Sequence, residues 1–303
     1  MSMKAIVFGG SGFIGGHVAD ALTEAGYEVI IFDLKPSPYL LPAQKMIIGD
    51  VLDEKAVFKA IRGCDYVYSF TGIADLDDAG TRPIDTVRQN IMGTTILLEA
   101  SRQNKIKRFV YASTIYVYSD KGGFYRCSKQ AAELYIEEYR RKFGLDYTIL
   151  RYGTVYGPRA DSRNSIYRYL KQAIEQGKIE CAGTGDEIRE YVHVRDVARL
   201  STGILAPEYR NQPVIITGHQ SMCFKDMLHM IKEILSNRVE IEFTGVKDEA
   251  HYSITPYSFV PKIGQKLVGH SYVDMGQGLL ECINEIYSQH SNTESKQGKP
   301  RIQ

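Results

Sequence analysis

The chain has 303 residues, of which 44% are hydrophobic and 24% are charged, a balance typical of a soluble globular protein. Lys and Arg total 37 and Asp and Glu total 36, so no overall basic field points to nucleic acid. No apolar run reaches the roughly 20 residues that span a bilayer, and the first residues lack the pattern of a signal peptide, so we expect no membrane partner.

The first half of the chain alternates predicted strands and helices. Short apolar runs predict strands, and apolar residues at intervals of three or four predict helices. Strands that are separated by helices favour a parallel, doubly wound α/β sheet of the Rossmann type. In chain order, strands are expected at 4–9, 27–33, 45–50, 64–72, 107–113 and 145–153, and helices at 13–26, 54–61, 84–103 and 124–144.

After about residue 155 the regular alternation is lost, although helices and short strands continue. We therefore divide the chain into a sheet domain at 1–155 and a smaller α/β region at 156–290. Residues 291–303 are polar and have no apolar periodicity, so we expect a disordered tail.

A glycine-rich loop, "FGGSGFIGG", lies directly after the first predicted strand and directly before the first predicted helix. Gly9 permits a tight turn, Gly12 lets the main chain approach a diphosphate, and Gly15 lets the helix pack close to the strand. The helix N-terminus then offers unpaired N–H groups to phosphates. This context predicts a dinucleotide site.

Two aspartates follow the next predicted strands. Asp33 ends the second strand, where its carboxylate could accept hydrogen bonds from the ribose hydroxyls and repel a 2′-phosphate, so it favours NAD over NADP. Asp50 ends the third strand, where it could bond the adenine amino group or simply form a turn.

The stretch "FVYASTIYVYSDKGGFYRCSK" gathers a threonine, a tyrosine and a lysine just past the fifth strand. A free tyrosine has a pKa near 10 and is a poor base at neutral pH. Lys129, one helical turn from Tyr125, and a bound oxidised nicotinamide would both favour the phenolate. Tyr125 could then take a proton from a sugar hydroxyl as hydride leaves its carbon, while Thr114 hydrogen-bonds the same oxygen.

These motifs together resemble the extended short-chain dehydrogenases/reductases, specifically the NAD-dependent nucleotide-sugar epimerase/dehydratase family. The resemblance covers about residues 3–290. The matching segments, in the family's order, are "GGSGFIG", "GDVLD", "NIMGTTILLEA", "FVYASTIYVY", "YRCSK", "LRYGTVYGPR" and "GTGDEIREYVHVRDVA".

The resemblance implies that Thr114, Tyr125 and Lys129 form the catalytic triad. It also implies that residues 1–155 bind NAD and that residues 156–290 bind a nucleotide-diphosphate sugar. Arg189 matches a position that contacts the substrate diphosphate. The residues expected to contact NAD are Gly9, Gly12, Phe13, Ile14, Asp33, Leu34, Asp50, Val51, Phe70, Thr71, Gly72, Asn90, Ser113, Tyr125, Lys129, Tyr152 and Gly153.

Asn90, Ser113 and Thr154 carry a more specific expectation from the resemblance. Asn90 is implied as a support of the site, and Ser113 is implied to lie near the nicotinamide. Thr154, a substrate-binding candidate, sits where many relatives have Asn and where the uronate epimerases have Thr.

Two departures from the family pattern narrow the expected chemistry. The 4,6-dehydratases have Asp and Glu after the catalytic Thr, whereas this chain has Ile115 and Tyr116, which cannot move a proton as a carboxylate does. Dehydration is therefore not expected, and epimerisation at C3 or C5 would need an additional acid/base pair. The loop between Thr114 and Tyr125 is also much shorter than in typical relatives, which suggests a more open pocket.

Oxidation at C4 of the sugar remains. We expect a 4-epimerase if the hydride returns to the opposite face, or a 4-dehydrogenase if the 4-keto sugar leaves. A catalytically weak NAD-binding regulator is the alternative of another class, and the complete triad favours the enzyme.

Cysteine usage and two helices bear on location and assembly. The cysteines have no CxxC spacing, so we expect reduced thiols in a cytoplasmic protein and no metal site. The helices predicted near 84–103 and 125–143 match the family's dimer helices, and the second carries extra apolar residues, so we expect a homodimer. The five cysteines are Cys64, Cys127, Cys181, Cys223 and Cys282.

Overall fold

The computed structural model describes residues 2–218, 221–245, 251–254 and 256. A seven-stranded sheet forms its centre, with strand order β10-β6-β5-β4-β1-β2-β3, and all of its strands pair in parallel. The predicted parallel α/β sheet is confirmed. Its strands are β1 (Lys4–Phe8), β2 (Glu28–Asp33), β3 (Lys45–Ile48), β4 (Tyr66–Ser69), β5 (Arg108–Thr114), β6 (Tyr147–Tyr152) and β10 (Gln212–Ile216).

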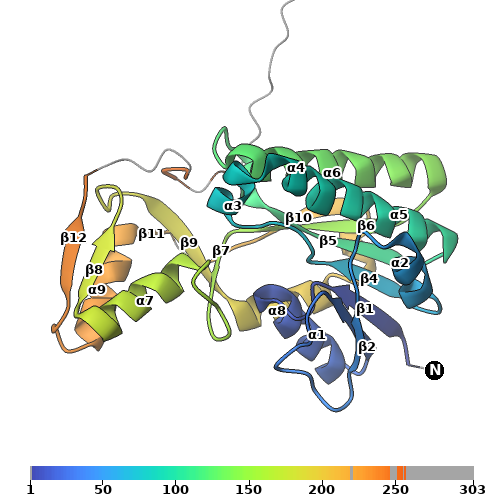
Figure 1. Cartoon of the computed structure of the whole chain (residues 1–303), viewed down its shortest axis with the longest axis horizontal. Helices are drawn as coiled ribbons and strands as arrows, with labels where there is room; N and C mark the ends of the chain where they lie inside the picture. The colour runs from blue at the N-terminus through green and yellow to red at the C-terminus, as the bar shows by residue number, and fades with distance from the viewer. Residues whose placement is uncertain (1, 219–220, 246–250, 255, 257–303) are drawn as a thin grey trace, which may run out of the picture. The chain divides into compact units, whose positions relative to one another are not determined.

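The central strands are mostly apolar because helices cover both faces of the sheet (Figure 1). Ile6 and Phe8 of β1 pack into one core, whereas Ala5 and Val7 pack into the other. The two alternating sets of side chains in β1 thus belong to opposite layers of the fold.

One helical layer consists of α2 (Glu54–Ile61), α5 (Gly93–Gln103) and α6 (Gly123–Phe143), and the other consists of α1 (Phe13–Glu24) and α8 (Val194–Gly203). Gly144, with φ of +74°, ends α6 in the left-handed conformation that glycine adopts readily. The remaining helical elements near the sheet are α3 (Leu76–Thr81), α4 (Pro83–Thr86), a π-helix (Val87–Met92) and two 3₁₀ turns (Ile115–Tyr118 and Pro207–Tyr209).

The helix predicted at 84–103 is observed as α4, the π-helix and α5 in succession. Each passes into the next with helical main-chain angles at the junctions, so the apolar periodicity of the sequence does not reveal the change. A π-helix inserts an extra residue into a turn and is frequent at functional sites.

The segment after β6 builds a smaller α/β region with its own core. One sheet has strand order β11-β9-β7 and a second pairs β12 with β8. Apolar side chains of α7 and α9, such as Ile166 and Leu228, pack on Ile179 of β8. The elements are β7 (Thr154–Tyr156), α7 (Ser165–Gln176), β8 (Lys178–Cys181), β9 (Ile188–His193), β11 (Ser221–Cys223), α9 (Phe224–Ile234) and β12 (Glu240–Phe243).

The expected boundary at residue 155 divides the chain in sequence but not in space. Between the two parts of the smaller region, α8 returns to pack on α1, and β10 adds to the edge of the main sheet beside β6. Val214 of β10 pairs with Leu150 of β6 there, so β10 extends the main sheet by one strand. The tail predicted at 291–303 lies outside the described residues.

Candidate active site

The predicted site residues follow the carboxyl ends of neighbouring parallel strands. Gly9 follows β1, Asp33 ends β2 and Phe70 follows β4. Thr114 ends β5, and Gly153 follows β6. Since parallel strands all end at the same edge of a sheet, the fold brings these positions together where α/β proteins bind ligands.

The glycine loop is packed too tightly for side chains. Gly9 has φ of +77°, and a Cβ there would lie 2.7 Å from the main chain that follows β4. A Cβ at Gly15 would lie 2.3 Å from the Gly9 carbonyl oxygen, so α1 begins directly against the loop. Gly12 caps α1 without a side-chain hydrogen bond, so the N–H groups of Phe13 and Ile14 are available to phosphate oxygens.

The carboxylate of Asp33 is fixed beside this loop. Its Oδ2 accepts a hydrogen bond from the Ser11 N–H at 3.0 Å, and its Oδ1 accepts one from the Lys35 N–H at 3.3 Å. The Ser11 hydroxyl also donates to the Lys35 carbonyl at 2.8 Å. The end of β2 is therefore tied to the glycine loop, next to the exposed Leu34, in the position expected for an adenosine ribose.

Asp50 has a structural role in a local turn. Its Oδ1 accepts a hydrogen bond from the Leu52 N–H at 2.9 Å, which forms a local turn. Val51 is buried, and a Cβ at Gly93 would lie 3.0 Å from it, so α5 packs closely on this turn. The contact of Asp50 with adenine stays a prediction.

Asn90 connects the loop after β4 to α6, the helix that carries Tyr125 and Lys129. It lies in the π-helix and is fully buried. Its Oδ1 accepts from the Ile73 N–H at 2.7 Å, and its Nδ2 donates to the Ile73 carbonyl at 2.9 Å and to Ser128 Oγ at 2.8 Å. A Cβ at Gly72 would lie 2.4 Å from Asn90 Oδ1. This geometry supports the expectation that Asn90 holds the site together.

A buried hydroxyl is a further sign that the predicted cofactor residues fit a dinucleotide. Thr71 Oγ1, after β4, is buried and has no hydrogen-bond partner among the described residues. A buried hydroxyl in this state is suited to a ligand, because an unsatisfied polar group is costly. With the free helix N-terminus and the fixed Asp33 carboxylate, the edge of the sheet fits NAD.

Thr114, Tyr125 and Lys129 come together between β5 and α6. Burial raises the pKa of Tyr125 to about 12. A hydrogen bond with the Thr114 side chain lowers this pKa, but its effect is smaller than that of burial. Lys129 is buried, donates to the Ala112 carbonyl at 2.8 Å and lies 4.7 Å from the centre of the Tyr111 ring. Burial lowers the Lys129 pKa to about 8, and the charge of Glu133 counteracts this.

The sequence analysis expected Lys129 and the nicotinamide to lower the pKa of Tyr125. In the chain alone, this pKa is raised. The charge of Lys129 is not among the causes that act on this pKa, and desolvation dominates. The Lys129 ammonium lies 5.8 Å from the centre of the Tyr125 ring and is hydrogen-bonded elsewhere. In the chain alone, burial therefore outweighs the Thr114 hydrogen bond and favours the neutral phenol.

A buried ion pair behind the triad was missed by the sequence analysis. Glu133 Oε2 lies 2.6 Å from Arg151 Nη2, and Glu133 Oε1 accepts from Arg151 Nε at 3.1 Å. Ser113 donates to the same Oε1 at 2.5 Å, and Arg151 Nη1 donates to the Tyr118 hydroxyl at 2.5 Å. The proton of the Ser113 hydroxyl is therefore engaged by Glu133, so this hydroxyl could contact the nicotinamide only as an acceptor.

Tyr152 and Gly153 shape the edge of the site. The Tyr152 hydroxyl bonds Ser201 Oγ at 2.8 Å, and its ring stacks on Phe70 with centroids 6.3 Å apart. The Gly153 N–H donates to the Ile216 carbonyl at 3.0 Å. Tyr152 thus anchors α8 and supports Phe70, and the cofactor contacts predicted for Tyr152 and Gly153 stay predictions.

A pocket of about 710 Å³ opens beside the triad. Thr114 and Tyr125 line it, together with Thr154 and Arg189 of the smaller region. The Arg189 guanidinium lies 4.5 Å from the centre of the Tyr252 ring. The fold therefore brings the two substrate-binding candidates into one pocket with Thr114 and Tyr125, two of the three predicted catalytic residues.

The short loop between Thr114 and Tyr125 does not simply open this pocket. Tyr116, in the 3₁₀ turn after β5, packs against Tyr252 with ring centroids 4.8 Å apart, and His251 lines the same pocket. Residues 251–253 therefore provide a wall at this side. No local sequence pattern linked them to Tyr116, because the contact joins positions far apart in the chain.

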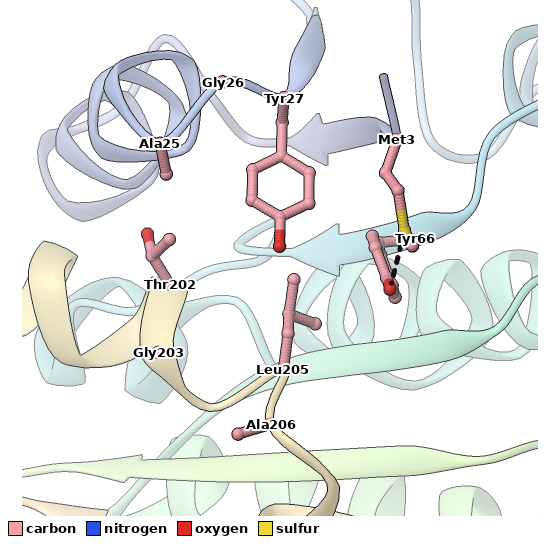
Figure 2. A pocket seen from close by; sticks show the side chains of 9 residues that line it. All are labelled: Met3, Ala25, Gly26, Tyr27, Tyr66, Thr202, Gly203, Leu205 and Ala206. Carbon is pink, nitrogen blue, oxygen red and sulfur yellow. Dashed lines mark hydrogen bonds between the residues drawn. The ribbon is translucent and has the colours of Figure 1, made fainter. Parts of the chain in front are cut away.

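A second pocket, of about 490 Å³, lies at the opposite edge of the sheet. Figure 2 shows Tyr27 and Tyr66 in it, with the Tyr66 hydroxyl donating to the Met3 sulfur at 3.1 Å. These residues precede or begin strands, so they lie at the amino edge of the sheet. Thr114 and Tyr125 are at the other edge, and this pocket takes no part in the candidate active site.

The fold and the pocket are those of a nucleotide-binding α/β protein in which Thr114, Tyr125 and Lys129 lie together at the ligand edge of the sheet. The chain belongs to the NAD dependent epimerase/dehydratase family, whose sequence profile matches residues 5–216. The predictions of the family, of an enzyme and of NAD as cofactor are confirmed. No helix in the described part of the chain is long and apolar enough to cross a membrane.

Relatives and solved structures agree with this placement. The UDP-glucuronate 4-epimerase of Thermodesulfobacterium geofontis is 24% identical over 92% of this chain and 94% of its own length. The Thermotoga maritima UDP-glucose 4-epimerase with UDP-glucose matches with a TM-score of 0.77 and 26% identity, over 85% of this chain and 90% of that one. The Bacillus cereus UDP-glucuronic acid 4-epimerase with UDP-glucuronic acid and NAD matches with a TM-score of 0.77 and 25% identity, over 86% and 95%.

Proposed function

We propose that the protein is a 4-epimerase of a UDP-sugar, with a UDP-hexose or UDP-hexuronic acid as substrate. The observation that carries this proposal is the Thr114–Tyr125 hydrogen bond beside the buried Lys129, in a pocket that Arg189 also lines. Relatives that act on UDP-glucose and UDP-glucuronic acid at C4 support the substrate class.

The chain's own residues perform the proton transfer. NAD, held by the glycine loop and Asp33, would supply a hydride acceptor and donor for C4 when bound. Tyr125 takes the proton of the C4 hydroxyl as the hydride leaves, and Thr114 holds the same oxygen. Lys129 adds positive charge near the phenolate, and Asn90 keeps the loop after β4 fixed against the helix that carries both.

The pocket supplies the groups that bind the substrate. Arg189 offers a cation for the diphosphate. Its guanidinium lies over the Tyr252 ring and donates to the Ile188 carbonyl, and it has no carboxylate partner among the described residues. Thr154 supplies a hydroxyl on the sugar side. The region assigned to residues 156–290 would thereby hold the nucleotide sugar, with residues 194–216 serving the main sheet.

The test is turnover of UDP-glucose, UDP-galactose and UDP-glucuronic acid with added NAD, read by NMR of the products. The Tyr125→Phe variant keeps the ring and removes the ionisable oxygen, so turnover should fall roughly 10²–10⁴-fold. Substrate deuterated at C4 should give an inverted product with deuterium still at C4. A free 4-keto sugar with reduced cofactor would instead identify a 4-dehydrogenase, and full activity of Tyr125→Phe would refute the mechanism.

We also propose a homodimer through α6 and the neighbouring α4 and π-helix. These elements pack against each other, and their outer surface exposes Ile84 (69%), Leu134 (66%), Val87 (52%) and Tyr135 (48%). Several large exposed apolar side chains on neighbouring helices are consistent with an interface. Light scattering at micromolar concentration should give twice the chain mass, and a monomer would contradict the proposal.

The cytoplasm is the compartment that we propose. Cys64, Cys127, Cys181 and Cys223 are free thiols, as expected in a reducing environment. Fractionation of the producing cells would test this placement.

A further inference from the structure

The substrate pocket contains a hydroxyl–imidazole pair that the triad does not use. The Tyr116 hydroxyl is hydrogen-bonded to Nδ1 of His251, which lies 135 residues further along the chain. Both side chains line the pocket together with Thr114 and Tyr125. A phenol in contact with an imidazole can exchange a proton with it, so the pair has the chemistry of an acid and a base.

The pair lies next to the triad. The Tyr116 N–H donates to Thr114 Oγ1 at 3.3 Å, and the Tyr116 ring stands edge-on to the Tyr125 ring with centroids 6.3 Å apart. The hydroxyls of Tyr116 and Tyr125 are thus presented by two neighbouring rings in one cavity. A sugar whose C4 oxygen contacts Thr114 and Tyr125 is in the same cavity as the second pair.

Contacts with the smaller region hold His251 in place. Ser253 accepts a hydrogen bond from the Ile188 N–H of β9 at 2.8 Å. Tyr252, between them, is buried, and its hydroxyl lies 3.5 Å from Thr154 Oγ1. The segment that carries the imidazole is therefore anchored on β9 and on the pocket wall.

We propose that Tyr116 and His251 form a second acid–base pair, which removes and returns the proton on a ring carbon next to C4 while C4 is a ketone. The proposal rests on the proposed function, because only oxidation at C4 makes the neighbouring C–H acidic. The sequence argument considered Tyr116 alone, and a phenol with an imidazole partner has a route for the proton that a phenol alone lacks.

The proton balance of the step is closed. The C–H bond next to the ketone breaks, its proton goes to the Tyr116 oxygen, and the hydroxyl proton of Tyr116 moves to His251 Nδ1. The electron pair of the C–H bond forms the enolate, whose oxygen at C4 receives hydrogen bonds from Thr114 and from Tyr125, which already holds the proton of the C4 hydroxyl. Return of the proton by the same pair, to the face from which it left, restores the sugar.

The experiment is turnover of UDP-glucose and UDP-glucuronic acid in D₂O with added NAD, followed by NMR of the H3 and H5 signals. Deuterium should enter C3 or C5 of the recovered sugar. Tyr116→Phe and His251→Gln should each lower the ratio of this incorporation to the C4 epimer formed in the same sample by roughly 10²-fold or more. Tyr167→Phe and His229→Gln, at exposed positions of α7 and α9, are the matched controls and should exchange like the wild type.

The outcomes separate the two proposals. Formation of the C4 epimer with no deuterium at C3 or C5 would overturn the second pair and leave the 4-epimerase intact. Undiminished incorporation in both Tyr116→Phe and His251→Gln would overturn it equally. If neither sugar is oxidised, the proposed function fails, and the second pair fails with it because its ketone never forms.

Discussion

Replacing Glu133 by Gln should destabilise the protein far more than the loss of an ordinary surface charge. Glu133 is only 6% exposed and holds Arg151 through two N–H groups, at 2.6 and 3.1 Å. Gln keeps the shape but has one oxygen instead of two and no charge, so the buried guanidinium loses its counter-ion. Breaking a buried pair in this way costs about 3–5 kcal/mol in the free energy of unfolding.

Urea unfolding followed by circular dichroism measures this cost. The matched control is Glu138→Gln on the same helix, because Glu138 pairs with Arg141 at the surface, where side chains are 49% and 79% exposed. That change should cost less than about 1 kcal/mol. The double variant Glu133→Gln/Arg151→Met should lose much less than the sum of the two single changes, since no lone buried charge remains.

Glu133→Gln should also change the pH dependence of turnover. The charge of Glu133 raises the Lys129 pKa against the larger effect of burial, so Glu133→Gln should lower that pKa below about 8. The alkaline limb of the pH–rate profile should then move to lower pH. A variant that is as stable as Glu138→Gln, with an unchanged alkaline limb, would refute the role given to the pair.

Three further predictions concern the cofactor loop and the triad. Gly15→Ala should weaken NAD binding in a fluorescence titration, because its Cβ would lie 2.3 Å from the Gly9 oxygen. The control Gly203→Ala has open space around its Cβ and should bind NAD normally. Asp33→Ala should reduce the preference for NAD over NADP in the same titration, and tighter NADP binding by the wild type would contradict that role of Asp33. The Lys129 pKa is 10.5 in the unfolded chain and about 8 in the folded one, so the unfolded state binds more protons between these values and the free energy of unfolding should rise with pH there. Lys129→Met should abolish this rise of about 3 kcal/mol in urea unfolding from neutral pH to about pH 10, and an equal rise in both proteins would show that the lysine is not buried as described.

The sheet and its ligand edge could be predicted from sequence because their signals are local. Apolar runs such as those around Val7 and Val110 mark strands that are covered on both sides, and the residue after each strand falls at the ligand edge by topology. The glycine spacing and the Tyr125–Lys129 spacing each lie within one turn or one helix. These features need no knowledge of the remote parts of the chain.

The rest of the site depends on contacts between distant positions. The approach of His251 to Tyr116 has no signal in either segment, and the π-helix that carries Asn90 reads as ordinary helix. The ion pair did leave a trace, which the sequence analysis passed over. Arg151 interrupts an apolar strand, and Glu133 lies between the buried Ala132 and Ile136, so each charge needed a buried partner.

The return of β10 to the main sheet has a consequence for how the chain folds during synthesis. Until residues 212–216 leave the ribosome, β6 is an edge strand, with apolar residues such as Ile149 and Leu150 that are buried in the finished protein. An unpaired apolar edge of this kind is a template for aggregation. A fragment that stops at residue 155 would keep this edge permanently open and would also lack α8, so the cofactor half of the molecule matures only after the polypeptide has passed through much of the substrate half.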